Sequence, residues 1–147
     1  MRKKGLLTKA ALFTVLLFSM VFIITGCKKD DKKGERNDIE FTVCSRDMLP
    51  EELYAIIEEK KENVSKFTYA NGSYMYIVVC YGEKERENLN VVVNDLFMTS
   101  NAIYIDTTLK TDKTSATDAV GVGELSMYPY IVLKCDKYDL PVVFEID

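Results

Sequence analysis

The spacing of hydrophobic and polar positions changes several times along this chain, and each spacing predicts an element. The segment 39–44, IEFTVC, alternates and predicts a strand with Ile39, Phe41 and Val43 on one face. The segment 73–81, SYMYIVVCY, is apolar or aromatic at nearly every position, which predicts a central strand covered on both faces. Further strands are expected at 88–98, 102–110, 127–135 and 142–146.

One segment has helical spacing instead. A proline, Pro50, stands at its start, acidic residues follow it, and lysines come about ten residues later, an order that suits the helix dipole. The apolar positions that recur on one face are Leu49, Leu53, Ile56 and Ile57. This pattern predicts a helix that begins near Glu51 and ends near Lys61.

The connections between these elements are polar. The run GEKERE after Tyr81 predicts a turn, Ser65 and Lys66 are expected in a loop, and the segment 111–123 predicts a long loop. Residues 39–147 have the size and composition of one globular domain. The predicted fold class is α+β, a small antiparallel β-sheet or sandwich with one N-terminal helix.

The first 26 residues differ from the rest. Basic residues open the chain, and a mainly apolar stretch runs from Gly5 to Gly26, as in a secretory signal peptide. The alternative is a retained transmembrane helix, since the 17 residues 10–26 approach the length of roughly 17–25 that crosses a bilayer. The sequence 24–27, ITGC, resembles the lipobox of bacterial lipoproteins and favours a signal peptide. That resemblance implies cleavage before Cys27 and a diacylglyceryl group on its sulfur, which would anchor the chain to a membrane.

A charged segment follows Cys27. The run 28–38, KKDDKKGERND, has no apolar side chain, so 27–38 is expected to be a lipidated cysteine followed by a solvated tether. Removal of residues 1–26 would take away four basic side chains and no acidic one, which leaves 15 basic against 23 acidic residues. A formal charge of −8 argues against nucleic acid as a partner.

Candidate catalytic residues are scarce. The chain has no histidine, which excludes Ser-His-Asp and Cys-His catalysis and imidazole metal ligation. Paired carboxylates such as Glu51 and Glu52 are accounted for by the helix start. The sequence therefore predicts a protein that is not an enzyme and that needs no cofactor or metal.

Three cysteines remain after Cys27, namely Cys44, Cys80 and Cys135, each in or beside a predicted strand. They could form one disulfide with a leftover thiol in an exported protein, or they could be small buried hydrophobic residues. The second interpretation is favoured, because no two of them are spaced as a close pair. A three-cysteine zinc site would lack an evident fourth ligand.

Tyrosine is the enriched aromatic residue, with nine in a chain that has no tryptophan. Tyr128 and Tyr130 are candidate protein-binding residues, since they are expected to share a strand face on either side of Pro129. Proline lacks a backbone donor, which favours the edge of a sheet, and an edge strand can pair with an incoming chain. The alternative is that Pro129 protects the edge against aggregation and that the tyrosines serve sheet packing.

The end of the chain carries a resemblance. YPYIVLK at 128–134 and LPVVF at 140–144 resemble the closing segment of the PrcB-like family, and weaker matches reach upstream to residue 39. The family is named for a lipoprotein subunit of a surface protease complex. The chain departs from it at 85–89, ERENL, where the family has a glycine-containing turn. The resemblance implies an accessory lipoprotein without catalysis of its own.

The expected function is therefore that of a membrane-anchored, extracytoplasmic lipoprotein that binds a protein, possible partners being an envelope protease or another surface protein. Three alternatives stay open. In an enzyme that uses carboxylates or lysine, a single Asp, Glu or Lys substitution would abolish turnover. In a β-sandwich protease inhibitor, the loop 82–88 or 111–124 would enter an active-site cleft. In a lipoprotein that binds a small ligand, a pocket would be needed, and the sequence does not locate one.

Overall fold

A computed structural model describes residues 35–85, 89–111 and 118–146. The predicted signal peptide, Cys27 and most of the predicted tether lie outside the described residues. Within the described ranges, no helix has the length and apolar character that crossing a membrane requires.

The described chain is mostly strand, with one α-helix and one short 3-10 helix. The helices are η2 (Arg46–Met48) and α2 (Glu51–Lys60). The strands are β1 (Asn37–Asp38), β2 (Thr42–Val43), β3 (Val64–Asn71), β4 (Tyr74–Tyr81), β5 (Asn90–Met98), β6 (Ile103–Lys110), β7 (Gly121–Val122), β8 (Tyr130–Asp136) and β9 (Val142–Ile146).

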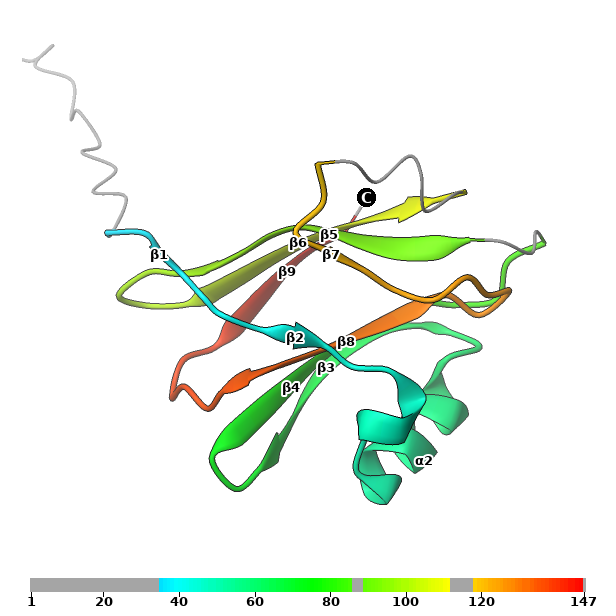
Figure 1. Ribbon diagram of the computed structural model, residues 1–147, viewed down its shortest axis with the longest axis horizontal. Helices are drawn as coiled ribbons and strands as arrows, with labels where there is room; N and C mark the ends of the chain where they lie inside the picture. Colours follow the sequence, from blue (N-terminus) through cyan, green and yellow to red (C-terminus); the bar gives the residue numbers. More distant parts are fainter. Residues whose placement is uncertain (1–34, 86–88, 112–117, 147) are drawn as a thin grey trace, which may run out of the picture. The chain divides into compact units, whose positions relative to one another are not determined.

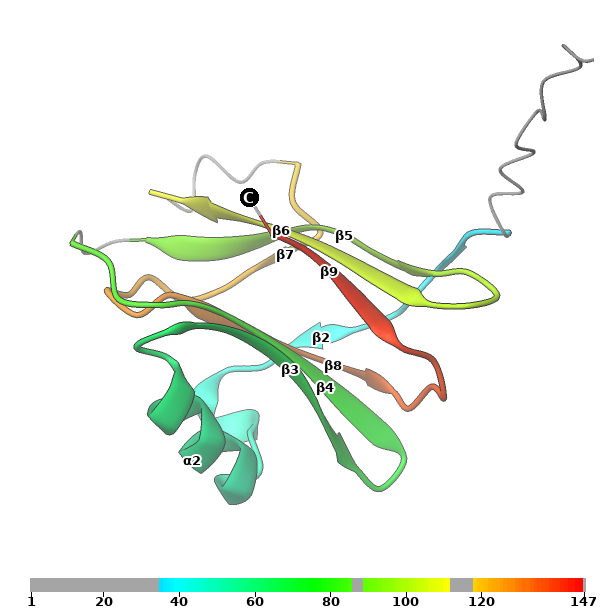
Figure 2. The same cartoon turned by 180° about the vertical axis from the view of Figure 1, so that it is seen from behind.

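These strands form two sheets packed face to face (Figures 1 and 2). The first has the order β1-β5-β6-β9, with β7 paired to β5, and the second has the order β2-β8-β4-β3. The mostly β fold with antiparallel sheets and one helix confirms the coarse prediction. One pair differs, because β9 runs parallel to β6. After β6 the chain passes through the second sheet as β8 before it returns to the first sheet. It returns as β9, which lies beside β6 and runs in the same direction.

The second sheet is the middle layer, with α2 on its outer face (Figure 2). Strand β4 is buried on both faces, as its uninterrupted apolar sequence predicts. Its residues Ile77 and Val79 lie in the core between the sheets, together with Leu133 of β8 and Ile105 of β6. On the other face, Val78 packs in a second core beneath the helix.

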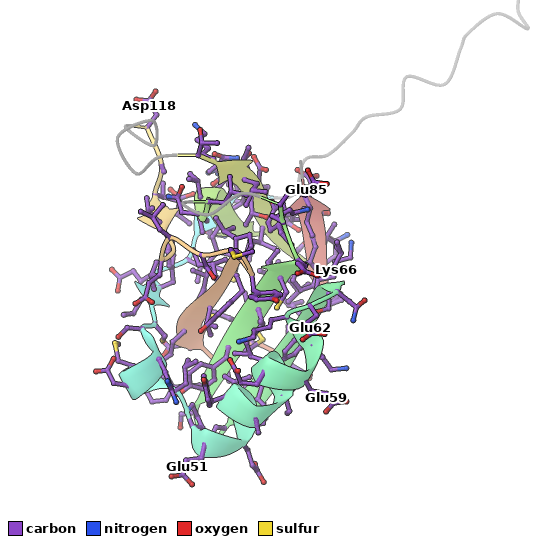
Figure 3. The ribbon with its side chains drawn as sticks, turned by 90° about the vertical axis from the view of Figure 1, so that its right-hand side faces the viewer. Glu51, Glu59, Glu62, Lys66, Glu85 and Asp118 are labelled. Carbon is purple, nitrogen blue, oxygen red and sulfur yellow. The ribbon has the colours of Figure 1, made fainter. Side chains whose placement is uncertain are left out.

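Helix α2 confirms the helical prediction. Leu53 and Ile57 are fully buried against the second sheet, as their spacing of four residues requires. Glu51 and Glu59 point away from the sheet (Figure 3). Pro50 is the N-cap and provides no side-chain cap, and the helix ends where the Lys61 N–H donates to the Ile57 carbonyl at 2.8 Å.

The prediction of one strand over 39–44 is wrong in its continuity. The chain pairs with β5 through β1, crosses between the sheets, and pairs with β8 through β2. The predicted face is nevertheless correct, since Ile39 is buried in the core between the sheets and Phe41 and Val43 pack against it. Apolar alternation indicates which side chains are buried, but it does not indicate which neighbouring strand supplies the backbone hydrogen bonds.

Two loop predictions also need correction. Ser65 and Lys66 lie in β3, which pairs with β4 along its whole length and joins it through a tight turn at Gly72, where φ is 61°. The predicted loop 111–123 includes β7, which pairs with Val92 and Val93. Alternate β3 residues are exposed, and polar residues such as Ser65 and Lys66 interrupt the apolar ones, which hides the strand in the sequence.

Candidate functional site: a groove beside Tyr130

A groove of about 440 Å³ opens where the edge of β8 meets α2. Four segments form its walls: the turn after β2, the exposed side of α2, the chain that leads from β7 to β8, and the first half of β8. The lining residues are 43–46, Tyr54, Glu58, Lys61, 122–126 and 130–132. The groove thus lies at the junction of both sheets and the helix.

Charged and aromatic side chains from the helix side define one wall. The Arg46 guanidinium stacks on the Tyr54 ring, 4.4 Å from its centre. The Lys61 Nζ donates to both carboxylate oxygens of Glu58, at 2.8 Å each. These bonds from Lys61 lower the pKa of Glu58, so its carboxylate stays ionised. Within the described chain, Arg46 forms no ion pair, although its charge also contributes to the lowered pKa of Glu58.

Tyr130 lies in the floor of the groove, at the start of β8. Its side chain is half-buried, and it packs against the core beneath α2. Burial, and then the negative charge of Glu124, raise the pKa of its hydroxyl. The phenol therefore stays protonated and can donate a hydrogen bond within the groove.

Tyr128 occupies a different position from the one expected. It precedes β8, so it does not share a strand face with Tyr130. Its hydroxyl donates to Glu83 at 3.4 Å, and the charge of Glu83 is the main cause of its raised pKa. The Lys61 Nζ lies 5.5 Å from the centre of its ring. Lys61 therefore connects Tyr128 to the groove, although Tyr128 does not line it.

The prediction that Pro129 marks an edge strand is wrong for β8 as a whole, because β8 lies between β2 and β4. Strand β2 is only two residues long, however, and it pairs with Leu133 and Lys134 alone. One more bond follows, from the Cys44 N–H to the Val132 carbonyl at 2.9 Å. Beyond it, β8 has β4 on one side and the groove on the other.

The backbone of Tyr130 faces this open side. The Tyr81 N–H donates to the Pro129 carbonyl at 3.0 Å, which fixes the alternation of hydrogen bonds between β4 and β8. By that alternation the backbone N–H and C=O of Ile131 point toward β4, and those of Tyr130 point away from it. No backbone partner for Tyr130 is present on that side among the described residues.

Two glycines keep the opposite wall close to β8. A Cβ at Gly123 would come within 3.0 Å of the Tyr130 carbonyl oxygen, and one at Gly121 within 3.0 Å of a Val43 methyl group. Both distances are tighter than most Cβ contacts, so a side chain at either position would make its neighbour shift by a few tenths of an ångström. Glycine therefore suits the close approach of the two sheets here.

The three cysteines are free thiols and are buried, in agreement with the favoured interpretation. Cys44 lines the groove, and burial raises its pKa, which makes it a poor nucleophile. Cys80 and Cys135 belong to the cores on opposite faces of the second sheet. Over the described ranges, no cluster of metal-ligating side chains is found.

A second hollow of about 360 Å³ lies at the other end of β8. There the Lys134 Nζ sits 3.8 Å from the centre of the Tyr74 ring, the same kind of contact that Arg46 makes with Tyr54 in the first groove. Thr42 pairs with Lys134 along this wall, so the β8 edge is covered at that residue, and the hollow is the smaller of the two. The first groove is therefore the better candidate site.

Sequence reasoning identified Tyr130 but missed its neighbours Arg46, Tyr54 and Glu58. A signal for the helix wall was available, because Tyr54, Glu58 and Lys61 recur at spacings of four and three residues. Such a stripe lies on one side of a helix, next to its apolar face. The contribution of Arg46 had no comparable signal, since it depends on how the turn after β2 packs against α2.

Comparison with protein-family models gives no match, and comparisons with the curated proteins and with the solved structures give none either. The resemblance to the PrcB-like family stays a prediction. So does the lipidation of Cys27, which lies outside the described residues.

Proposed function

We propose that this chain is a membrane-anchored, extracytoplasmic lipoprotein that binds another protein through the groove beside Tyr130 and carries out no catalysis of its own. The observation that carries the binding role is the backbone of Tyr130 at the start of β8, which has no partner on the groove side among the described residues, in a groove lined also by Tyr54 and Arg46. Tyrosine and arginine are the residue types that contribute most to protein interfaces.

The anchoring role has separate support. The ITGC sequence before the charged tether favours lipid on Cys27, and two acyl chains hold a protein stably at a membrane. Figure 1 shows β1, where the described chain begins, at the far end of the domain from α2. A tether attached at β1 would leave the groove accessible to a partner at the cell surface.

The absence of a catalytic role has chemical support. The groove contains no histidine, its Lys61 is paired with Glu58, and its Cys44 has a raised pKa. None of these groups is prepared to act as a nucleophile or general base near neutral pH. The PrcB-like resemblance suggests an envelope protease as the partner.

The test is crosslinking of the native protein in its host membrane, followed by isolation and mass spectrometry of the complex and of the N-terminus. We expect lipid on Cys27 and one recurrent surface-protein partner, crosslinked to residues around the groove. The control is Cys27→Ser, which should release the protein from the membrane. A solitary protein in the membrane, or crosslinks confined to the outer face of the first sheet, would contradict the proposal.

A small-molecule ligand is the second candidate. The groove volume of about 440 Å³ falls in the range of ligand pockets, roughly 300–1,000 Å³. This candidate predicts that native mass spectrometry of the isolated protein shows a bound small molecule, and that Tyr130→Ala removes it. The protein-binding proposal predicts neither result.

A further inference from the structure

We propose that the partner enters the groove as an extended polypeptide segment that adds a strand beside Tyr130 and places a carboxylate against Arg46. This inference rests on the proposed protein-binding function and specifies how the partner is recognised.

The first support is the geometry of the sheet edge. Strand β2 stops after Val43, and its last bond to β8 is donated by Cys44 to Val132. The next residue on that side of β8 is Tyr130, which has no backbone partner there among the described residues. An extended chain that continues the line of β2 would supply the missing partner, because strands in a sheet pair through regularly spaced backbone groups.

The second support is that the groove reaches the β8 edge where β2 ends. The groove is bounded by residues 43–46 on one side and by 122–126 on the other, with Tyr130, Ile131 and Val132 between them. The chain after β2 turns away into η2, so it leaves the position beside Tyr130 unfilled. A short sheet edge with a wall on each side has room for one extended chain, and a partner with a broad, flat binding surface cannot reach it.

The third support is the charge of the walls. Glu58 is neutralised by Lys61, whereas Arg46 is exposed and has no ion-pair partner in the described chain. Arginine stacked on an aromatic ring presents a planar fork that matches a carboxylate. On the opposite wall, the exposed Glu124 disfavours a second acidic side chain. The two walls thus select a segment whose acidic group lies on the Arg46 side.

The approach of Gly123 limits how the segment can bind. Its backbone lies against the Tyr130 carbonyl, as the 3.0 Å distance from a hypothetical Cβ shows. The incoming strand therefore pairs chiefly with the Tyr130 N–H, and its side chains must be small where they pass Gly123. This arrangement predicts a backbone-dependent site with a modest preference in side chains.

The probe is a library of random peptides of roughly eight to ten residues, about the length of a strand, selected on the full-length lipoprotein in detergent. Selected peptides are then resynthesised with alternate backbone amides replaced by alkene isosteres, which removes the carbonyl groups that could accept from the Tyr130 N–H. We expect replacement in one alternation to weaken binding about tenfold and in the other to have little effect. Equal effects of both alternations, or no selected peptide, would overturn strand addition.

The charge element is tested on the protein with a matched pair of variants. Arg46→Glu should weaken binding of the selected acidic peptides about fivefold or more, whereas Lys137→Glu, the same change at an exposed turn outside the groove, should not. Equal binding by the two variants would overturn the role of Arg46.

If the native protein is crosslinked to a partner while these peptide results are negative, the inference fails and the proposed function stands. A solitary native protein removes the proposed function itself.

Discussion

The two halves of β8 differ in what surrounds them. From Leu133 to Asp136 the strand has β4 on one side, and β2 covers its other side at Leu133 and Lys134. From Tyr130 to Val132 it has β4 on one side and the groove on the other, with Cys44 at the boundary. Leu133 and Lys134 thus have a strand on both sides, whereas the first half is where we propose that a partner binds.

The difference arises from the length of one short strand. An unpaired sheet edge is an aggregation hazard, which proteins limit by keeping it short and flanked. Here Pro129, the turn into η2 and the wall at Gly123 limit the open edge to the backbone of Tyr130. The edge is accessible to one extended chain and too short to support extended sheet stacking.

The largest expected effect is in the paired half. Leu133 is fully buried in the core between the sheets. Leu133→Ala removes that packing, and we expect the free energy of unfolding to fall by about 2–5 kcal/mol. Chemical denaturation measures it. The matched variant in the open half, Tyr130→Ala, should cost less, since Tyr130 is half-buried. Equal losses would show that the halves do not differ in packing.

The second effect depends on pH and also concerns the paired half. Burial, and then the charge of Asp136, raise the pKa of the Cys135 thiol from 9.0 to about 11. Between these pH values the folded state holds the proton and the unfolded state loses it, so stability falls as pH rises. The loss should reach about 2–3 kcal/mol near pH 11.

Cys135→Ala should flatten this part of the curve, measured as the unfolding free energy between pH 8 and about pH 11. Part of the slope should remain, because burial also raises the pKa of Cys44 and Cys80. An unchanged slope in Cys135→Ala would contradict a buried, protonated thiol at this position.

The third prediction concerns the pairing of β2 with β8, which separates the two halves. Thr42 is exposed and pairs with Lys134 across β2 and β8. Thr42→Pro removes a backbone donor and should cost about 1 kcal/mol, whereas Thr42→Ala keeps the donor and should cost less. Denaturation of both variants measures the difference. If they are equal, β2 contributes no hydrogen bond at this position.

The smallest effect on stability is expected in the groove. Arg46→Glu loses the stacking on Tyr54, so the free energy of unfolding should change by under about 1 kcal/mol. Thermal unfolding of the variant, compared with Lys137→Glu, provides the measurement. A loss comparable to that of Leu133→Ala would mean that Arg46 serves the fold and is not reserved for a ligand.

Sequence reasoning worked where burial determines the pattern. The helix over Glu51–Lys60 and the doubly covered strand β4 follow from apolar spacing, and each has the predicted faces. It did not predict β3, because a strand with one exposed face and polar residues such as Ser65 and Lys66 resembles a loop. The parallel pairing of β9 with β6 depends on how distant segments meet, and local periodicity contains no such information.

For the site, Tyr130 was predicted for a reason that proved partly wrong. Pro129 suggested an edge strand, and β8 is an interior strand whose edge is open only locally. The length of β2 decides this, and six alternating residues at 39–44 predicted a longer pairing than two residues provide. A change of sheet within a continuous alternating segment leaves no trace in the sequence pattern.

Amide hydrogen exchange on the full-length protein in detergent tests directly whether the β8 edge at Tyr130 is open. We expect the Tyr130 amide to exchange much faster than the amides of Ile131 and Leu133, which are bonded to β4. We also expect a bound partner to slow the exchange of Tyr130 selectively. Uniform slow exchange along β8 in the free protein, or a partner that leaves Tyr130 unchanged, would contradict these expectations.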